Sequence, residues 1–272
     1  MEPFAFRIGY LGEGFYGFAR QPGRPTVEGT LVEGLERRGL LDPSAPLQVA
    51  SRTDRGVHAL GNVISFVPRV PGLSAARALS ALHPAIFCRG YAPVPRGFDP
   101  RHARSRRYRY FDRGRAEALE TYQEGAELFR GEHEFSSFGR RDEPPRPTRR
   151  RVDLFELQTR GPDLVLEVEA PGFLWGQVRK MVSALRALSE GKLSLRALSE
   201  ALEGRRRLTL PLAEPEALML AEVRYDFPWR EPDPAGRGRW RRRWEAARED
   251  ARLRWTLLGE FQETLGGERS DP

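Results

Sequence analysis

Large apolar side chains alternate with smaller or polar ones at the start of the chain, and this pattern predicts a β-strand over residues 4–10. A loop rich in glycine and proline follows. Thr26 is suited to cap a helix, and Val27, Leu31 and Leu35 fall at the i, i+4, i+8 spacing of one helical face. The chain therefore begins with a strand, a loop and a helix.

The same patterns predict the later elements. Further strands are expected at residues 47–50, 63–67, 107–111, 152–157, 164–169 and 218–225, and helices at 74–83, 119–129, 173–189 and 195–202. The tail after Pro228 is rich in Pro, Gly and Arg, and we expect it to be helical over about residues 241–265. Strands and helices do not alternate strictly, which favours an α+β fold over a doubly wound sheet.

Composition places the chain among folded proteins. Its 272 residues suit one large domain or about two, and 39% hydrophobic with 10% aromatic residues argue against a disordered chain. The single cysteine, Cys88, excludes an intrachain disulfide and a Cys-based zinc site. No apolar run approaches the ~18 residues of a membrane span, and residues 1–7 carry no signal-peptide or transit-peptide pattern. We therefore expect a cytoplasmic protein.

The chain is basic, with 45 Lys and Arg against 38 Asp and Glu and a net charge of +7. Lysine occurs only at positions 180 and 192, and Asn and Ile are also scarce, so part of the arginine abundance reflects a GC-rich genome. The arginines gather in three stretches, at 101–115, 140–151 and 237–243. Such clusters suit a polyanion, although solvated loops and helix faces would give the same pattern.

Two familiar kinds of site are poorly supported. Gly12, Gly14 and Gly17 have the G-x-G-x-x-G spacing of a dinucleotide site, which requires a helix to begin there. Pro22 and Pro25 would break such a helix, so a Gly-rich turn that approaches a ligand closely is the better interpretation. The four histidines show no paired-ligand spacing, and we expect no metal site.

The densest polar segment lies between the strands predicted at 47–50 and 63–67. It reads Ala50-Ser51-Arg52-Thr53-Asp54-Arg55-Gly56-Val57-His58. Asp54 lies between two arginines, and nearby cations favour the ionised carboxylate, which is then ready to act as a nucleophile or a base. The alternative is a salt bridge within a loop, and the residue types alone favour that alternative.

The segment Arg52-Thr53-Asp54-Arg55-Gly56-Val57 closely resembles the catalytic loop of the TruA family of tRNA pseudouridine synthases. The resemblance covers about residues 4–226 in order, through Tyr10 to Phe18, Thr26 to Gly29, Phe98 to Tyr110, Gly131 to Phe138 and Gly172 to Val182. The continuation Ala59-Leu60-Gly61-Asn62 is most similar to archaeal members. Leu11, Ala19 and Ser183 depart from the residues common in the family, at positions outside the implied catalytic set.

The resemblance implies isomerisation of uridine to pseudouridine in tRNA, without a metal or any other cofactor. Asp54 would be the catalytic carboxylate, attacking the base or the sugar or abstracting a proton, and Arg179 would pair with it. Tyr108 would stack on the target base after that base has flipped out of the RNA. Arg52 would help to hold the flipped arrangement, and Arg55 would also bind substrate.

The implied fold is α+β, with two similar halves whose antiparallel sheets join into one extended sheet, helices packed on it and the active-site cleft between the halves. We expect residues 1–105 to carry the Asp54 loop, 106–228 to carry Tyr108 and Arg179, and 229–272 to form an Arg-rich extension. The family also implies a homodimer without membrane association. Arginines at 101–115 and 140–151 would line the cleft, and the targets would be uridines at about positions 38 to 40 of the tRNA anticodon arm.

Two other classes of protein stay open. A non-catalytic tRNA-binding or RNA-chaperone module on the same fold would explain the charge equally well, but not the joint presence of Asp54, Tyr108 and Arg179. A nuclease would need a carboxylate cluster for Mg²⁺ or a clear histidine pair, and the sequence offers neither. Formation of pseudouridine on unmodified tRNA without added metal separates these classes.

Overall fold

The computed structural model describes residues 2–41, 46–140, 147–232, 245–253 and 257. The chain divides into two compact units, Met1–Arg230 and Glu231–Pro272. In the second unit residues 245–253 are helical, within the predicted range 241–265, most of whose remaining residues lie outside the described part. The boundary expected between residues 105 and 106 lies within the first unit and stays a prediction.

The first unit contains ten strands and five α-helices among its described residues. The strands are β1 (Phe4–Tyr10), β2 (Gln48–Val49), β3 (His58–Phe66), β4 (Ile86–Pro93), β5 (Ser105–Asp112), β6 (Gly131–Glu134), β7 (Arg149–Val152), β8 (Leu154–Arg160), β9 (Asp163–Ala170) and β10 (Leu218–Arg224). The helices are α1 (Val27–Glu36), α2 (Gly72–Leu79), α3 (Leu119–Phe129), α4 (Gln177–Ser189) and α5 (Leu195–Leu202). None of the described helices is long and apolar enough to cross a membrane.

The predictions from local pattern are confirmed for β1, α1, α3 and α5. The side chains of Thr26 and Ser194 cap their helices, each accepting a 3.2 Å hydrogen bond from a backbone N–H three residues on. Strand β3 begins earlier than predicted, at His58, because this residue pairs with β10. Helix α4 begins at Gln177 rather than at residue 173, because Gly176 before it is left-handed, with φ of 74°.

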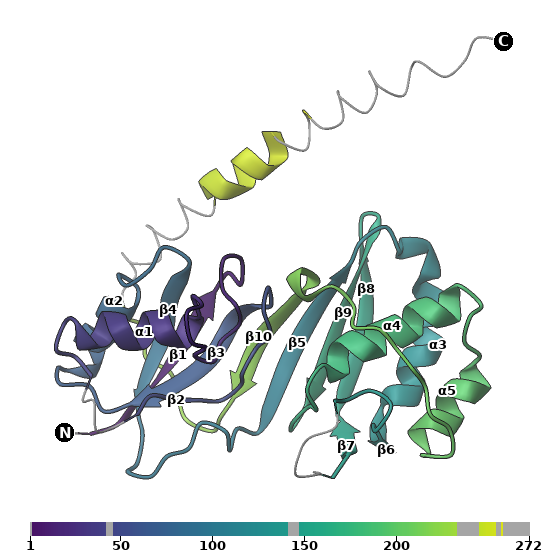
Figure 1. The fold of residues 1–272 in the computed structure, drawn as a ribbon, viewed down its shortest axis with the longest axis horizontal. Coiled ribbons are helices and arrows are strands. Elements are labelled where there is room, and N and C mark those ends of the chain that lie inside the picture. Colours follow the sequence, from purple (N-terminus) through teal and green to yellow (C-terminus); the bar gives the residue numbers. More distant parts are fainter. Residues whose placement is uncertain (1, 42–45, 141–146, 233–244, 254–256, 258–272) are drawn as a thin grey trace. The chain divides into compact units, whose positions relative to one another are not determined.

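Seven strands lie side by side in the order β4, β1, β3, β10, β5, β9 and β8, and β2 pairs with β3 (Figure 1). Every one of these pairs is antiparallel except β3 with β10, which is parallel. That parallel pair joins the N-terminal strands to the C-terminal strands. The prediction of an α+β fold with two antiparallel sheets joined into one is therefore confirmed.

One row of registered residues crosses the sheet, through Tyr10, Ala59, Leu220, Tyr108, Val168 and Phe155. Since registered neighbours point to the same face of a sheet, these side chains share one face. Helices α1 and α2 pack on the N-terminal part of that face, and α3, α4 and α5 pack on the C-terminal part (Figure 1). Tyr108 contacts both hydrophobic clusters and so lies where the two halves meet.

The opposite face of the C-terminal strands carries a ladder of ion pairs. Arg107 lies 2.6 Å from Glu169 and 2.8 Å from Glu167, and Arg109 also pairs with Glu167. The expectation that the arginines of 101–115 line the cleft is wrong for these two. Side chains alternate along a strand, so Tyr108 takes the cleft face and its two neighbours take the other.

Candidate active site

The polar loop of residues 50–57 packs directly on the Gly-rich loop of residues 11–25. The backbone N–H of Phe18 donates to the carbonyl oxygen of Thr53 over 3.0 Å. A Cβ atom at Gly12 would lie 2.5 Å from a carbonyl oxygen of the polar loop, and one at Gly17, where φ is +97°, would lie 2.9 Å from the Thr53 oxygen. These glycines therefore permit the two backbones to meet. The close approach that the structure shows is to the Asp54 loop, and the expected approach to a ligand stays a prediction.

A buried hydrogen-bond network supports the polar loop from beneath. The side-chain amide of Asn62, fully buried, donates to the Ser51 carbonyl over 2.8 Å and to the Tyr10 hydroxyl over 3.2 Å. That hydroxyl lies 2.8 Å from the Thr53 hydroxyl. Burial raises the pKa of Tyr10, which keeps its phenol protonated. The residues before Asp54 are thus fixed by satisfied buried groups.

Helix α4 brings Arg179 to Asp54. The Nη1 atom of Arg179 donates to Oδ2 of Asp54 over 3.1 Å, and its Nε donates to the Ala213 carbonyl over 2.6 Å. The Arg179 side chain is only 10% exposed and that of Asp54 is 23% exposed. A buried guanidinium is costly unless it is paired, and here both of its contacts satisfy it. The predicted contact between the two residues is therefore present, whereas their catalytic roles stay predictions.

The pair lies on the wall of a pocket of about 730 Å³. Its lining combines the Asp54 loop from the N-terminal half with β5, α4 and the segment before α4 from the C-terminal half. The predicted cleft between the halves is therefore present, with a volume typical of small-ligand sites. Among the described residues, no three His, Cys, Asp or Glu side chains gather so that they could hold a metal ion.

Tyr108 presents an aromatic ring to this pocket. It is half-buried, and the ring of Phe173 meets it edge to face with 5.3 Å between centroids. Burial raises the pKa of Tyr108 to about 12, so its phenol stays neutral in ordinary buffers. A neutral ring held by a second ring is suited to stacking on a nucleobase. Phe173 is a residue to which the sequence analysis gave no role.

The two arginines that flank Asp54 lie differently. Arg52 is exposed, lines the pocket and forms no ion pair within the part of the chain that the structure describes. The guanidinium of Arg55 lies instead over the ring of Tyr16, 4.3 Å from its centroid, and that of Arg24 lies 4.4 Å from the same centroid. The structure thus brings Arg52 to the pocket and leaves Arg55 outside its wall. Their substrate-binding roles stay predictions.

Arg106 also belongs to the site, although from the sequence it was only one of the arginines of the 101–115 stretch. The guanidinium of Arg106 is buried and donates to the carbonyls of Pro171 (2.6 Å) and Ala50 (3.3 Å). It therefore joins the segment that carries Phe173 to the start of the Asp54 loop. The alternation that places Tyr108 on the cleft face places Arg106 there as well, and this was the signal available in the sequence.

Trp175 is a third residue without a predicted role. Its side chain lines the pocket and is 45% exposed, which is unusual for so large an apolar group. The Arg140 guanidinium lies 5.5 Å from the centroid of its ring, and the backbone N–H of Arg140 donates to the Trp175 carbonyl over 3.2 Å. An arginine of the 140–151 stretch therefore does lie beside the pocket, as expected, whereas Arg141 and Arg146 fall outside the described residues.

Comparisons with known proteins bear on the family to which the chain belongs. Residues 126–226 match the family described as tRNA pseudouridine synthase. The chain is 39% identical over 225 residues to tRNA pseudouridine synthase A of Pyrococcus abyssi, covering 82% of this chain and 84% of that protein. It is 38% identical over 261 residues to the protein of the same name from Thermococcus kodakarensis, covering 94% and 97%.

A solved structure, of a Cbf5-Nop10-Gar1 complex, is similar with a TM-score of 0.36 and 16% identity, and the match covers 67% of this chain and 44% of that chain. Both archaeal relatives are identical to this chain at more than a third of the aligned positions, and each alignment covers more than four fifths of the chain. These matches confirm the resemblance that the loop around Asp54 and its companion segments indicated. The chain belongs to the family of tRNA pseudouridine synthases.

Proposed function

We propose that this protein isomerises uridine to pseudouridine in tRNA, with Asp54 as its catalytic carboxylate. The observation that carries this proposal is the 3.1 Å contact between Asp54 and Arg179 on the wall of a pocket that also holds Tyr108. Membership of the family favours catalysis over a non-catalytic tRNA-binding module. The test is incubation with an unmodified tRNA transcript in the presence of a chelator, followed by detection of pseudouridine.

The arrangement suits the chemistry. Uridine and pseudouridine are isomers, so cleavage of the C–N bond and formation of the C–C bond need no second reactant. Tyr108 stacks on the base that has left the RNA helix. Arg179 orients the Asp54 carboxylate through their 3.1 Å contact while that carboxylate attacks the base or the sugar or takes a proton.

The rim of the pocket is suited to RNA. Arg52 and Arg101 are exposed cationic residues of its lining, and Trp175 adds an exposed aromatic surface beside Arg140. Guanidinium groups neutralise phosphates, and aromatic rings stack on unpaired bases of any sequence. These two kinds of contact support binding of a folded tRNA through its backbone and one extruded nucleotide.

We infer that the target uridines lie in the anticodon arm, at about positions 38 to 40. Support comes from the resemblance to the TruA family and from a pocket rim that has one stacking tyrosine and several arginines, which does not require a particular base sequence. Mapping of pseudouridine on a full-length transcript and on an isolated anticodon arm tests this. Modification confined to another arm would overturn the target while leaving the chemistry in place.

A homodimer and a cytoplasmic location are further proposals that rest on the same resemblance. In the dimer each tRNA would contact both subunits. Light scattering of the purified protein at several concentrations, with and without tRNA, tests the oligomeric state. Fractionation of the cells that make the protein tests its location.

A further inference from the structure

A short segment connects the Asp54–Arg179 pair to the rest of the C-terminal half. We call residues 213–216, which lead into β10, the strap. The carbonyl of Ala213 accepts the 2.6 Å hydrogen bond from Arg179, the carboxylate of Glu214 lies 2.8 Å from Nη1 of Arg186, and the carbonyl of Glu216 lies 3.1 Å from Nε2 of His58. The strap is therefore held by α4 on one side and by the start of β3 on the other.

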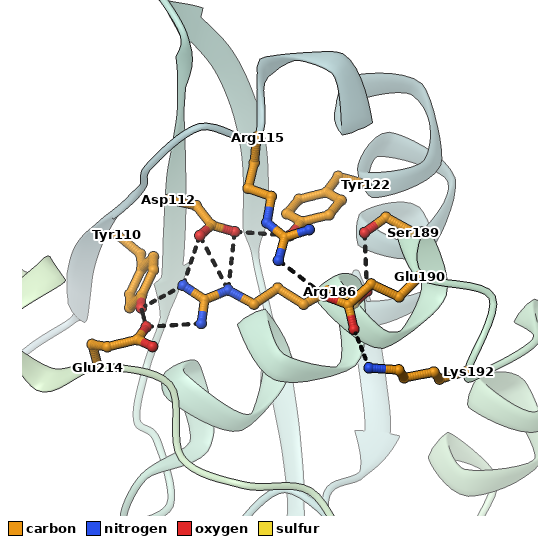
Figure 2. Close-up of polar contacts among 9 residues, drawn as sticks. All are labelled: Tyr110, Asp112, Arg115, Tyr122, Arg186, Ser189, Glu190, Lys192 and Glu214. Carbon is orange, nitrogen blue, oxygen red and sulfur yellow. Dashed lines mark hydrogen bonds and ion pairs between the residues drawn. The ribbon is translucent and has the colours of Figure 1, made fainter. Parts of the chain in front are cut away.

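The Arg186 side chain is itself fixed by hydrogen bonds to Asp112 (Figure 2). Its Nη2 and Nε atoms donate to the carboxylate of Asp112 over 2.7 and 3.1 Å, and the Tyr122 hydroxyl donates to the same carboxylate over 2.8 Å. The Asp112 side chain is 1% exposed. Burial opposes the charge of Arg186, but Asp112 and Glu214 together keep its pKa above the ordinary value.

Glu214 is bound by residues of two elements. It accepts hydrogen bonds from Arg186 on α4 and from the Tyr110 hydroxyl on β5, the latter over 2.8 Å (Figure 2). Residues 179 and 186 lie about two turns apart on α4, so both guanidinium groups reach the same side of that helix. Two consecutive strap residues, Ala213 and Glu214, are thus each bound by one arginine of α4.

The planarity of arginine makes this arrangement matter for the active site. Arg179 uses Nε toward Ala213 and Nη1 toward Asp54. Because the guanidinium is a rigid fork, the direction of its Nε–H bond sets the direction in which Nη1 points. The position of the Ala213 carbonyl therefore decides how Arg179 meets Asp54.

We propose that Arg186 and Glu214 are positioning residues for the Asp54–Arg179 pair, and that they act by holding the strap in place. This inference rests on the proposed function and deepens it. The competing interpretation is that Arg186 only neutralises the buried Asp112. That role needs no partner at Glu214, whose side chain is 58% exposed, so substitutions at Glu214 distinguish the two.

The experiment compares Glu214→Ala and Glu214→Gln with a matched control, Glu190→Ala. The Glu214 variants leave the Asp112–Arg186 pair intact. Glu190 lies at the end of the same helix and does not contact the strap. Its replacement by Ala removes comparable ion pairs, with Arg115 (2.9 Å) and Lys192 (2.8 Å). Thermal unfolding of all three variants verifies that they are folded.

We expect Glu214→Ala to lower kcat by about 10- to 100-fold, as small misplacements of catalytic groups do. The Kd for tRNA should stay within about threefold, because phosphate contacts dominate binding. Glu214→Gln, which can still accept both hydrogen bonds, should recover most of the rate, and Glu190→Ala should match the wild type.

A second readout does not depend on turnover. The Nε–H proton of Arg179, assigned by its loss in Arg179→Lys, should exchange slowly with water in the wild type and faster in Glu214→Ala. A folded Glu214→Ala protein with wild-type kcat and wild-type exchange of the Arg179 Nε–H proton would overturn the positioning role, and so would equal impairment of the Ala and Gln variants. A wild type that forms no pseudouridine would instead overturn the proposed function. The exchange measurement would still test whether Glu214 positions Arg179 through the strap.

Discussion

Arg179 and Asp54 are 125 positions apart in the sequence, yet the Nη1 atom of one lies 3.1 Å from the Oδ2 atom of the other. The carboxylate comes from the loop before β3, and the guanidinium comes from α4. They meet because β3 pairs with β10, the only parallel contact among the pairs of the described sheet. The pair therefore exists only when both halves of the first unit are assembled.

Replacement of Asp54 by Asn should abolish formation of pseudouridine, because an amide is neither a nucleophile nor a base at this position. The Kd for tRNA should stay within about tenfold of wild type, since phosphate contacts supply most of the binding. Single-turnover assays and filter binding measure the two effects. Asp153→Asn, which loses only a surface pair with Arg151, is the control. Residual isomerisation by Asp54→Asn would remove Asp54 from the catalytic role.

Replacement of Arg179 by Ala should slow the reaction by about 10²-fold or more, as loss of an electrostatic contact in an enclosed site does. It should also destabilise the fold by about 1–3 kcal/mol, because the buried Ala213 carbonyl loses its donor. Turnover and urea unfolding measure these changes.

The control for Arg179 is Arg196→Ala on α5, whose side chain is 89% exposed and pairs with Glu200. It should leave rate and stability unchanged, because exposed pairs contribute little. An Arg179→Ala enzyme with the rate of Arg196→Ala would contradict the role given to Arg179.

Substitutions of Tyr108 should separate its ring from its hydroxyl. Tyr108→Leu should lose about 1–3 kcal/mol of stacking, a fall of roughly 5- to 150-fold in kcat/KM, whereas Tyr108→Phe should stay close to wild type. Because the pKa of Tyr108 is raised to about 12, its phenol is protonated at every lower pH. The wild type and Tyr108→Phe should therefore show the same alkaline limb up to about pH 11. A limb that only the wild type shows below that pH would mean that the hydroxyl takes part.

Binding of tRNA should weaken steeply with salt. About six phosphate contacts imply a loss of roughly 10³ in affinity between 50 and 200 mM salt. Arg52→Glu and Arg140→Glu should each reduce the slope of log Kd against log salt by about one, without moving the modified position. Arg160→Glu, at the exposed end of β8, is the matched control. A flat titration would show that the arginines reflect codon usage rather than RNA binding.

Glu214 should make stability depend on pH in the acidic range. Its own backbone N–H, with the Tyr110 hydroxyl and Arg186, lowers its pKa to about 2 in the folded protein. A lowered pKa contributes stability that is complete above the ordinary pKa and is lost as the pH falls toward 2. At pH 7 the free energy of unfolding of the wild type should be higher than that of Glu214→Gln by up to about 1 kcal/mol. The difference is small because the Glu214 side chain is mostly exposed. Urea unfolding at pH 7, 4 and 3 should show this gap closing, and a constant gap would contradict the account.

Much of the secondary structure follows from the sequence, because its causes are local. The apolar positions of α1 and the caps at Thr26 and Ser194 involve residues within two turns of one another. The segment around Asp54 can also be recognised locally, because it is a dense polar run between two predicted strands. Strand β4 was missed, because Cys88-Arg89-Gly90 interrupts its apolar pattern and its formation depends on pairing with β1.

The α+β class follows from the residue pattern, and the family resemblance adds the Asp54 loop as the candidate site and Tyr108 as its stacking ring. The role of each arginine could not be predicted in this way, because it depends on contacts that form only in the folded protein. Arg106, Arg107 and Arg109 look alike in the sequence, yet one is buried between two loops and the others neutralise glutamates on the far face. The partner of each arginine depends on the register of β5 against β9 and of α4 against the strap. An ion pair forms only where distant parts of the backbone bring opposite charges within reach.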